Sequence, residues 1–194
     1  GICRPGPVEI LPGKMIENVC DFYEHHLEQL PRRSNGSCYQ AIVHGDLNAG
    51  NIILDDRNHV WVIDFSHSAR SHVLMDLIKL ENDLLFVMTP ISGVDELQAA
   101  MSLTDVLVNV EDLTAALPDY TPGDHAQLAR AWETARMLRA YYPRLVPDDG
   151  DPYQLWVGLL RYAVHTLGFE ESDIWQRRWA LYTASRCIQQ IRSQ

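Results

Sequence analysis

The sequence predicts one α+β domain that is predominantly α-helical and carries a small β-hairpin. Two short apolar runs, at residues 52–54 and 60–63, flank a turn-forming stretch, and helical spacing of apolar residues begins after residue 72. A length of 194 residues suits one domain with its own core. We therefore expect residues 1–194 to form a single unit.

The elements expected before the hairpin are few. The first thirteen residues contain three prolines and three glycines, so we expect an irregular lead-in. Residues 15–30 show helical spacing of apolar side chains and stop before Pro31. A polar loop at 32–37 and a short apolar run at 41–43 follow.

The chain after the hairpin is expected to be helical throughout. Pro152 suits the first turn of one helix, Ser172 suits the N-cap of another, and Pro143 comes just after the end of a third. The expected helices span residues 73–88, 95–108, 124–142, 152–167 and 172–191. All five tryptophans, Trp61 in the hairpin included, are expected to pack in the interior.

Polar residues that could act in catalysis or bind a metal ion flank the hairpin. The octapeptide HGDLNAGN, from His44 to Asn51, precedes it, and Asp64-Phe65-Ser66 follows thirteen residues after Asn51. A carboxylate such as Asp46 can orient a hydroxyl group and accept its proton. Asn51 and Asp64 offer the oxygen ligands that hard divalent cations prefer.

These motifs resemble the aminoglycoside phosphotransferase and choline kinase branch of the protein-kinase-like fold, over roughly residues 42–80. The resemblance implies a C-terminal kinase lobe with the hairpin carrying the catalytic and metal-binding loops. It implies that Asp46 is the catalytic base and that Asn51 and Asp64 bind Mg²⁺ in an ATP-dependent reaction. It further implies that His44 and Asp76 support the catalytic loop.

Two departures from protein kinases favour a small-molecule acceptor. Gly45 stands where protein kinases usually have arginine. Only eleven residues separate Asp64 from Asp76, and they contain no Ala-Pro-Glu, so there is little room for a peptide platform. We therefore expect phosphate transfer to a small-molecule hydroxyl, although the sequence assigns no substrate-binding residues.

The nucleotide-binding parts of a kinase are missing from the sequence. Forty-three residues precede His44 and contain no G-x-G-x-x-G pattern, and the two lysines, Lys14 and Lys79, do not lie where the family has its strand lysine. We expect a missing N-terminal lobe or a partner domain, and little kinase activity from this chain alone. The apolar face left uncovered also favours a homodimer.

Two other functions stay open. The chain can be an inactive kinase-like module that works as a binding or scaffolding domain. Alternatively, His67 and His72 near Asp64 can belong to a metal-dependent phosphoesterase. Six acidic residues either line a site for a cationic acceptor or lie in solvated loops and helix starts: Asp148, Asp149, Asp151, Glu170, Glu171 and Asp173.

Composition excludes several classes of partner. The formal net charge of −10 disfavours nucleic acid binding. No apolar run is long enough to cross a bilayer and no apolar signal core begins the sequence, so we expect a cytoplasmic protein that does not bind membranes. The four cysteines form no C-x-x-C pair, which indicates free thiols: Cys3, Cys20, Cys38 and Cys187.

Overall fold

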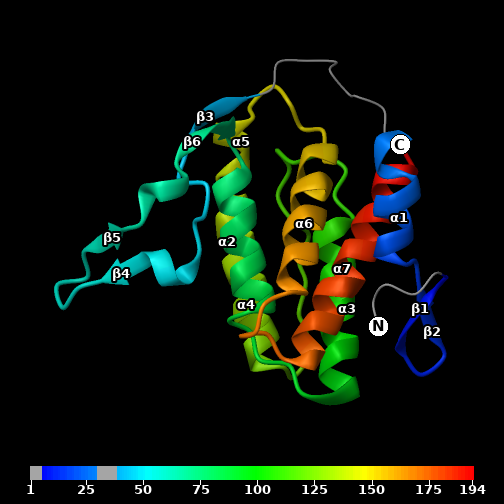
Figure 1. Ribbon diagram of the computed structural model, residues 1–194. Helices are drawn as coiled ribbons and strands as arrows, with labels where there is room; N and C mark the ends of the chain where they lie inside the picture. The colour runs from blue at the N-terminus through cyan, green and yellow to red at the C-terminus, as the bar shows by residue number, and fades with distance from the viewer. Residues whose placement is uncertain (1–5, 30–38) are drawn as a thin grey trace.

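The computed structural model in Figure 1 describes residues 6–29 and 39–194 and is a mainly helical α+β fold, as predicted. Five long helices and the short α5 (Tyr142–Leu145) form the body. The long helices lie close to their expected positions: α2 (Met75–Phe86), α3 (Gly93–Val108), α4 (Ala126–Arg139), α6 (Tyr153–Thr166) and α7 (Ile174–Arg192). α7 packs against α3 and α6, and α2 packs against α4 and α6.

Within residues 6–29 and 39–194, three two-stranded antiparallel sheets lie at the edges of the helical body. They are β1 (Val8–Leu11) with β2 (Lys14–Ile16), β3 (Gln40–Val43) with β6 (Ala69–His72), and β4 (Ile52–Leu54) with β5 (Val60–Val62). The last pair is the predicted hairpin, with Ile53 opposite Trp61. Figure 1 shows that β4 and β5 project away from the helices, beyond the β3–β6 pair.

The described part of the lead-in, expected to be irregular, is instead the β1–β2 hairpin. Its turn contains Gly13 at φ 76°, and the backbone N–H of Gly13 donates to Glu9 Oε1 at 2.8 Å. Ile10 and Ile16 are buried in the core. Their burial outweighs the local preference of proline and glycine for irregular structure.

The helix expected at residues 15–30 is shorter than predicted. Residues 15 and 16 belong to β2, and α1 (Val19–His25) begins after Asn18, whose side chain accepts from the Cys20 N–H at 2.9 Å. A 3₁₀ turn, η1 (Leu27–Gln29), follows. The expected helix end at Leu30 and the polar loop at 32–37 lie outside the described residues.

Three of the expected features at helix ends differ in detail. Asp173, rather than Ser172, caps α7 in a capping box with Gln176, while the Ser172 hydroxyl donates to Phe86 O at 3.2 Å. Pro152 precedes α6 instead of lying in its first turn. Pro143 lies within the first turn of α5 rather than in a loop.

Four of the five tryptophans pack as expected, and one does not. Trp132, Trp156 and Trp179 are buried, and Trp175 packs against the core while partly exposed. Trp61 is 57% exposed, so the expectation for it is wrong. The hairpin that carries Trp61 projects from the helical body, where the side chain finds little to pack against.

The structure describes two of the four cysteines, and it bears on whether any helix could span a membrane. Cys187 is a free, buried thiol, and its burial raises its pKa to about 12. Cys3 and Cys38 lie outside the described part of the chain. No helix within residues 6–29 and 39–194 has the length and apolar character needed to span a bilayer.

A buried ion pair joins α2 to α4. The Arg139 guanidinium donates to both carboxylate oxygens of Glu81, at 2.9 and 2.6 Å, and to the carbonyl of Leu107 at 2.6 Å. Glu81 is 1% exposed. The pair fixes the position of α2 because neither charge can be left without its partner in the interior.

We predict that Arg139→Met lowers the free energy of unfolding by about 3–5 kcal/mol, because it leaves the Glu81 carboxylate buried and uncompensated. Urea denaturation measures the change. Arg136→Met, on the same helix, removes an exposed pair with Glu133 and should cost less than about 0.5 kcal/mol. Similar losses in the two variants would show that the buried pair has no special role.

Candidate functional site

The loop from His44 to Asn51 joins β3 to β4 and is held at its start by His44. The His44 ring is buried, and its Nε2 donates to the backbone carbonyl of Ile63 at 2.7 Å. The backbone N–H of Asp46 in turn approaches His44 Nδ1 at 3.4 Å. His44 thus links the loop to Ile63, just before Asp64. This geometry suits a residue that supports the loop.

Asp76 holds the same end of the loop from the first turn of α2. Its two carboxylate oxygens accept the backbone N–H groups of His44 and Gly45, at 2.7 and 2.9 Å. Hydrogen bonds to an ionised acceptor are about twice as strong as neutral ones. The loop conformation therefore depends on a carboxylate thirty-one residues away from the nearer N–H in sequence.

Two further residues of α2 contact the loop, and sequence reasoning assigned neither of them a role. Asp83 accepts the Ala49 N–H at 2.9 Å, and Lys79 Nζ lies 3.4 Å from Asp46 Oδ1. Asp76, Lys79 and Asp83 are three and four residues apart, a spacing that puts them on one face of a helix. Charged residues at this spacing within an apolar helix were the signal that could have found them.

Lys79 is buried beside the carboxylate expected to act as base. Its Nζ lies 5.6 Å from the ring centroid of Tyr162 and 5.5 Å from that of Phe169. The Asp46 side chain is 38% exposed, whereas that of Lys79 is 7% exposed. Asp46 is therefore paired with a cation on one side and open to solvent on the other.

Asn51 and Asp64 are brought together at the base of the β4–β5 hairpin. The side-chain amide of Asn51 donates to Asp46 O at 2.9 Å, and the Ile63 N–H donates to Asn51 O at 3.0 Å. Because Ile63 immediately precedes Asp64, this bond holds Asp64 next to the loop. The structure thus gathers the three residues expected to be base and metal ligands into one region.

Asp64 has an uncommon backbone conformation and a carboxylate that accepts hydrogen bonds from Ser66. It adopts a left-handed conformation, φ 61° and ψ 62°, which is uncommon outside glycine and is found where local bonds enforce it. Hydrogen bonds from the hydroxyl of Ser66, at 2.6 Å, and from its N–H hold the pKa of Asp64 below its ordinary value. An exposed carboxylate that stays ionised suits a divalent cation.

The neighbouring histidines do not join Asp64 in a metal-ligating cluster. His72 Nδ1 accepts the Leu74 N–H at 3.2 Å near the start of α2, and His67 Nδ1 lies 3.2 Å from Ser66 Oγ. Among the described residues, no three His, Cys, Asp or Glu side chains form a group that could hold a metal ion. Asn51 and Asp64 could hold Mg²⁺ with water and phosphate oxygens as further ligands.

The structure explains the glycine at position 45. Gly45 has φ 88°, and a Cβ added there would overlap the backbone carbonyl of His67. Any side chain at this position, arginine included, would strain the backbone and collide with the segment that follows Asp64. The departure from the protein-kinase pattern therefore follows from close packing of two loops.

Several of the acidic residues considered for an acceptor site form structural hydrogen bonds instead. Asp173 caps α7, Asp151 accepts the Tyr153 N–H at 2.9 Å, and Asp148 accepts from the Tyr39 hydroxyl at 3.1 Å. These contacts favour the interpretation as helix starts and loops.

Exposed apolar side chains gather around the loop and the hairpin. We call this group the hairpin surface, and it includes some of the most exposed large apolar residues in the described chain: Ile42, Ile53, Leu54, Val60, Trp61 and Phe65. Ile42 alone is 77% exposed. Large apolar side chains left exposed together on one projecting element are typical of an interaction site.

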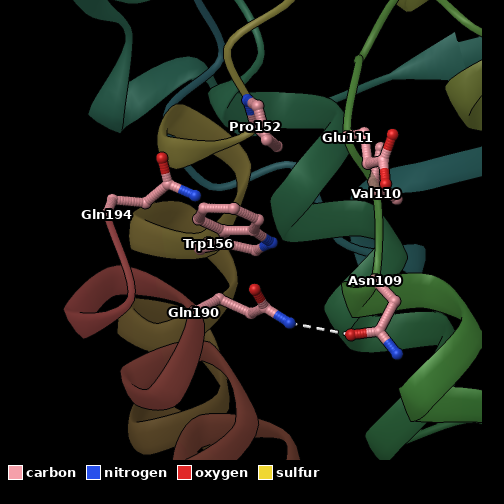
Figure 2. A pocket seen from close by; sticks show the side chains of 7 residues that line it. All are labelled: Asn109, Val110, Glu111, Pro152, Trp156, Gln190 and Gln194. Carbon is pink, nitrogen blue, oxygen red and sulfur yellow. Dashed lines mark hydrogen bonds between the residues drawn. The ribbon is translucent and has the colours of Figure 1, made fainter.

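One hollow lies elsewhere in the described chain, between the ends of α3 and α7 and the start of α6. Its volume is about 380 Å³. Figure 2 shows Trp156, Pro152 and Val110 together with polar side chains around it. Gln190 Nε2 donates to Asn109 Oδ1 at 2.7 Å, and Trp156 is 2% exposed. It shares no residue with the loop, so we do not assign it to the candidate site.

The fold and the loop together define a helical α+β domain whose polar loop is held by one buried helix. The family model of ternary complex associated domain 9 matches residues 4–168. The chain belongs to this family, and the matched range includes the loop, the hairpin and all of α2. No curated protein and no solved structure matched the chain.

We predict that Gly45→Ala lowers the free energy of unfolding by about 2–4 kcal/mol, because strain at positive φ adds to the overlap with His67. Gly123→Ala is the matched control, since Gly123 has φ 67° but open space where its Cβ would lie. It should cost about 1 kcal/mol. Equal unfolding midpoints for the two variants would mean that the loops simply move apart.

Proposed function

We propose that the chain is the catalytic lobe of an ATP- and Mg²⁺-dependent phosphotransferase that acts on a hydroxyl group of a small molecule. The observation that supports this most is the convergence of Asp46, Asn51 and Asp64 at the base of one hairpin, on a loop anchored by His44 and Asp76. These residue types at these positions suit phosphoryl transfer, which depends on positioning and charge neutralisation.

In this proposal each residue has a defined task. Asp46 orients the acceptor hydroxyl and accepts its proton, and its open side is where an acceptor can approach. Lys79 balances the charge of Asp46 from the buried side. Asn51 and Asp64 would hold Mg²⁺, while ATP supplies the phosphoryl group.

A small acceptor is favoured by the short segment between Asp64 and α2. Residues 65–67 form the 3₁₀ turn η3, and β6 pairs with β3 immediately afterwards. The segment is therefore fully used in structure that supports the loop. It offers no extended platform for a peptide.

A nucleotide-binding lobe or partner domain is proposed to cover the hairpin surface. Within the described residues, Lys14 begins β2 and its Nζ lies 5.1 Å from the Tyr182 ring centroid, while Lys79 is committed to Asp46. Neither is available to hold β- and γ-phosphates as a kinase strand lysine does. A second copy of the chain is the alternative occupant of this surface.

The second candidate function is a binding module without catalysis. The pairing of Lys79 with Asp46 supports it, because one Asp46 oxygen already contacts a buried cation and is not free for an acceptor hydroxyl. The family description, ternary complex associated domain, also points to assembly with other proteins. Phosphoester hydrolysis has less support, since His67 and His72 have local roles.

We predict that Mn²⁺, used as a probe for Mg²⁺, binds weakly to the chain alone and at least about 10-fold more tightly with ATP, because phosphate oxygens complete the metal shell. Asp64→Ala should abolish the enhancement in a titration followed by electron paramagnetic resonance. Asp112→Ala is the matched control, since Asp112 Oδ1 likewise accepts from the hydroxyl and N–H of Thr114. Unchanged binding in Asp64→Ala would remove Asp64 from the metal site.

We predict that Asp46→Asn lowers kcat by about 10²–10⁴-fold in protein that includes the nucleotide lobe or its partner, because the acceptor hydroxyl loses its base. The affinity for ATP should change little. ADP formation with a panel of hydroxylated small molecules measures the rate, and Asp56→Asn in the exposed hairpin turn is the control. Full activity in Asp46→Asn would argue for another base.

A further inference from the structure

A smaller hollow, of about 230 Å³, lies between α2 and α6. We propose that it is a binding site for a small organic anion with an apolar, ring-sized body, such as an aryl carboxylate. This goes beyond the proposed phosphotransferase, because binding in the hollow requires neither nucleotide nor phosphate transfer.

The walls of the hollow are largely apolar. Met75 and Ile78 come from α2, and Val157 and Tyr162 come from α6. The two helices touch closely at Gly158, where an added Cβ would lie 2.8 Å from Ile78 Cδ1. Close helix contact gives the hollow a firm floor, so an apolar ligand finds a preformed surface.

Charge around the hollow selects the ligand. Among its lining side chains, Arg161 alone carries a full charge at neutral pH, since burial lowers the pKa of His72 and leaves that ring neutral. The negative charge of Asp149 lies near His72 and Gln154, at the end of the hollow opposite to Arg161. Gln154 and Arg161 are about 10 Å apart along α6, so an anionic group is favoured at the Arg161 end.

The volume limits the ligand to about one ring with a short substituent. A dry cavity of about 150 Å³ is large enough for benzene, and pockets that bind drug-sized ligands measure about 300 Å³ or more. The hollow lies between these values. The larger hollow in Figure 2 is a weaker candidate, because its Gln190 and Asn109 amides already bind one another.

The hollow adjoins the candidate site. Tyr162 forms part of its wall, and its ring also lies 5.6 Å from Lys79 Nζ, which pairs with Asp46. Met75 immediately precedes Asp76, the residue that anchors the loop. A ligand in the hollow therefore lies next to the side chains that hold the loop.

The experiment measures binding of three probes that share a phenyl ring, by NMR titration of the chain without nucleotide. Phenylacetate should bind at least about 5-fold more tightly than 2-phenylethanol, and 2-phenylethylamine should bind most weakly. Comparable affinities of the acid and the alcohol for the parent chain would overturn the assignment of an anionic ligand.

Two variants locate the site. Val157→Phe should fill the hollow and weaken phenylacetate binding at least about 10-fold. Val94→Phe on α3 is the matched control, since Val94 and Val157 are 42% and 41% exposed, and it should bind as the parent does. Equal binding by the two variants would show that the ring binds elsewhere.

Arg161→Gln provides an independent test, because Arg161 is exposed and the replacement removes only its charge and its guanidinium contact over the Tyr162 ring. It should remove the preference for the acid over the alcohol and leave alcohol binding unchanged. A preserved preference would exclude Arg161 as the anion-binding group. Because no nucleotide is present, these outcomes are separate from those of the phosphotransferase proposal.

Discussion

The interaction on which the rest of the structure depends is the pairing of the Asp76 carboxylate with the backbone N–H groups of His44 and Gly45. A loop that leaves a strand and turns under a helix has donors that water cannot fully reach, and these need partners. A charged helix residue meets that need and in return is stabilised in a partly buried position. Without this contact the start of the loop would lose its fixed position relative to α2.

α2 satisfies several such demands at once, which explains why so many polar residues are buried on one helix. Asp83 binds the far part of the loop, Lys79 balances Asp46, and Glu81 joins α4 through Arg139. Each buried charge has an opposite charge or a backbone donor, so the desolvation cost is offset. The same helix forms one wall of the hollow beside α6. The candidate site and the proposed anion-binding hollow therefore share α2.

The hairpin shows the opposite arrangement, with apolar residues left in solvent. Removing the side chains of Ile53, Leu54 and Trp61 from water would be favourable, yet all three are exposed. They lie on strands that project from the helical body. Two-stranded hairpins are marginal by themselves, and a partner that covers the apolar surface would stabilise this one. The proposed partner domain and the metal ligands at the base of the hairpin therefore concern the same region of the chain.

The sequence by itself determined the helical elements, the hairpin and the residues around it, because helical periodicity and turn chemistry are local properties. The β1–β2 hairpin, the start of α1 and the exposure of Trp61 could not be predicted, since they depend on burial against distant segments. Lys79 and Asp83 were missed for the same reason. The tertiary structure alone decided their partners, because ion pairs and hydrogen bonds between residues more than thirty positions apart follow from how α2 packs on the loop.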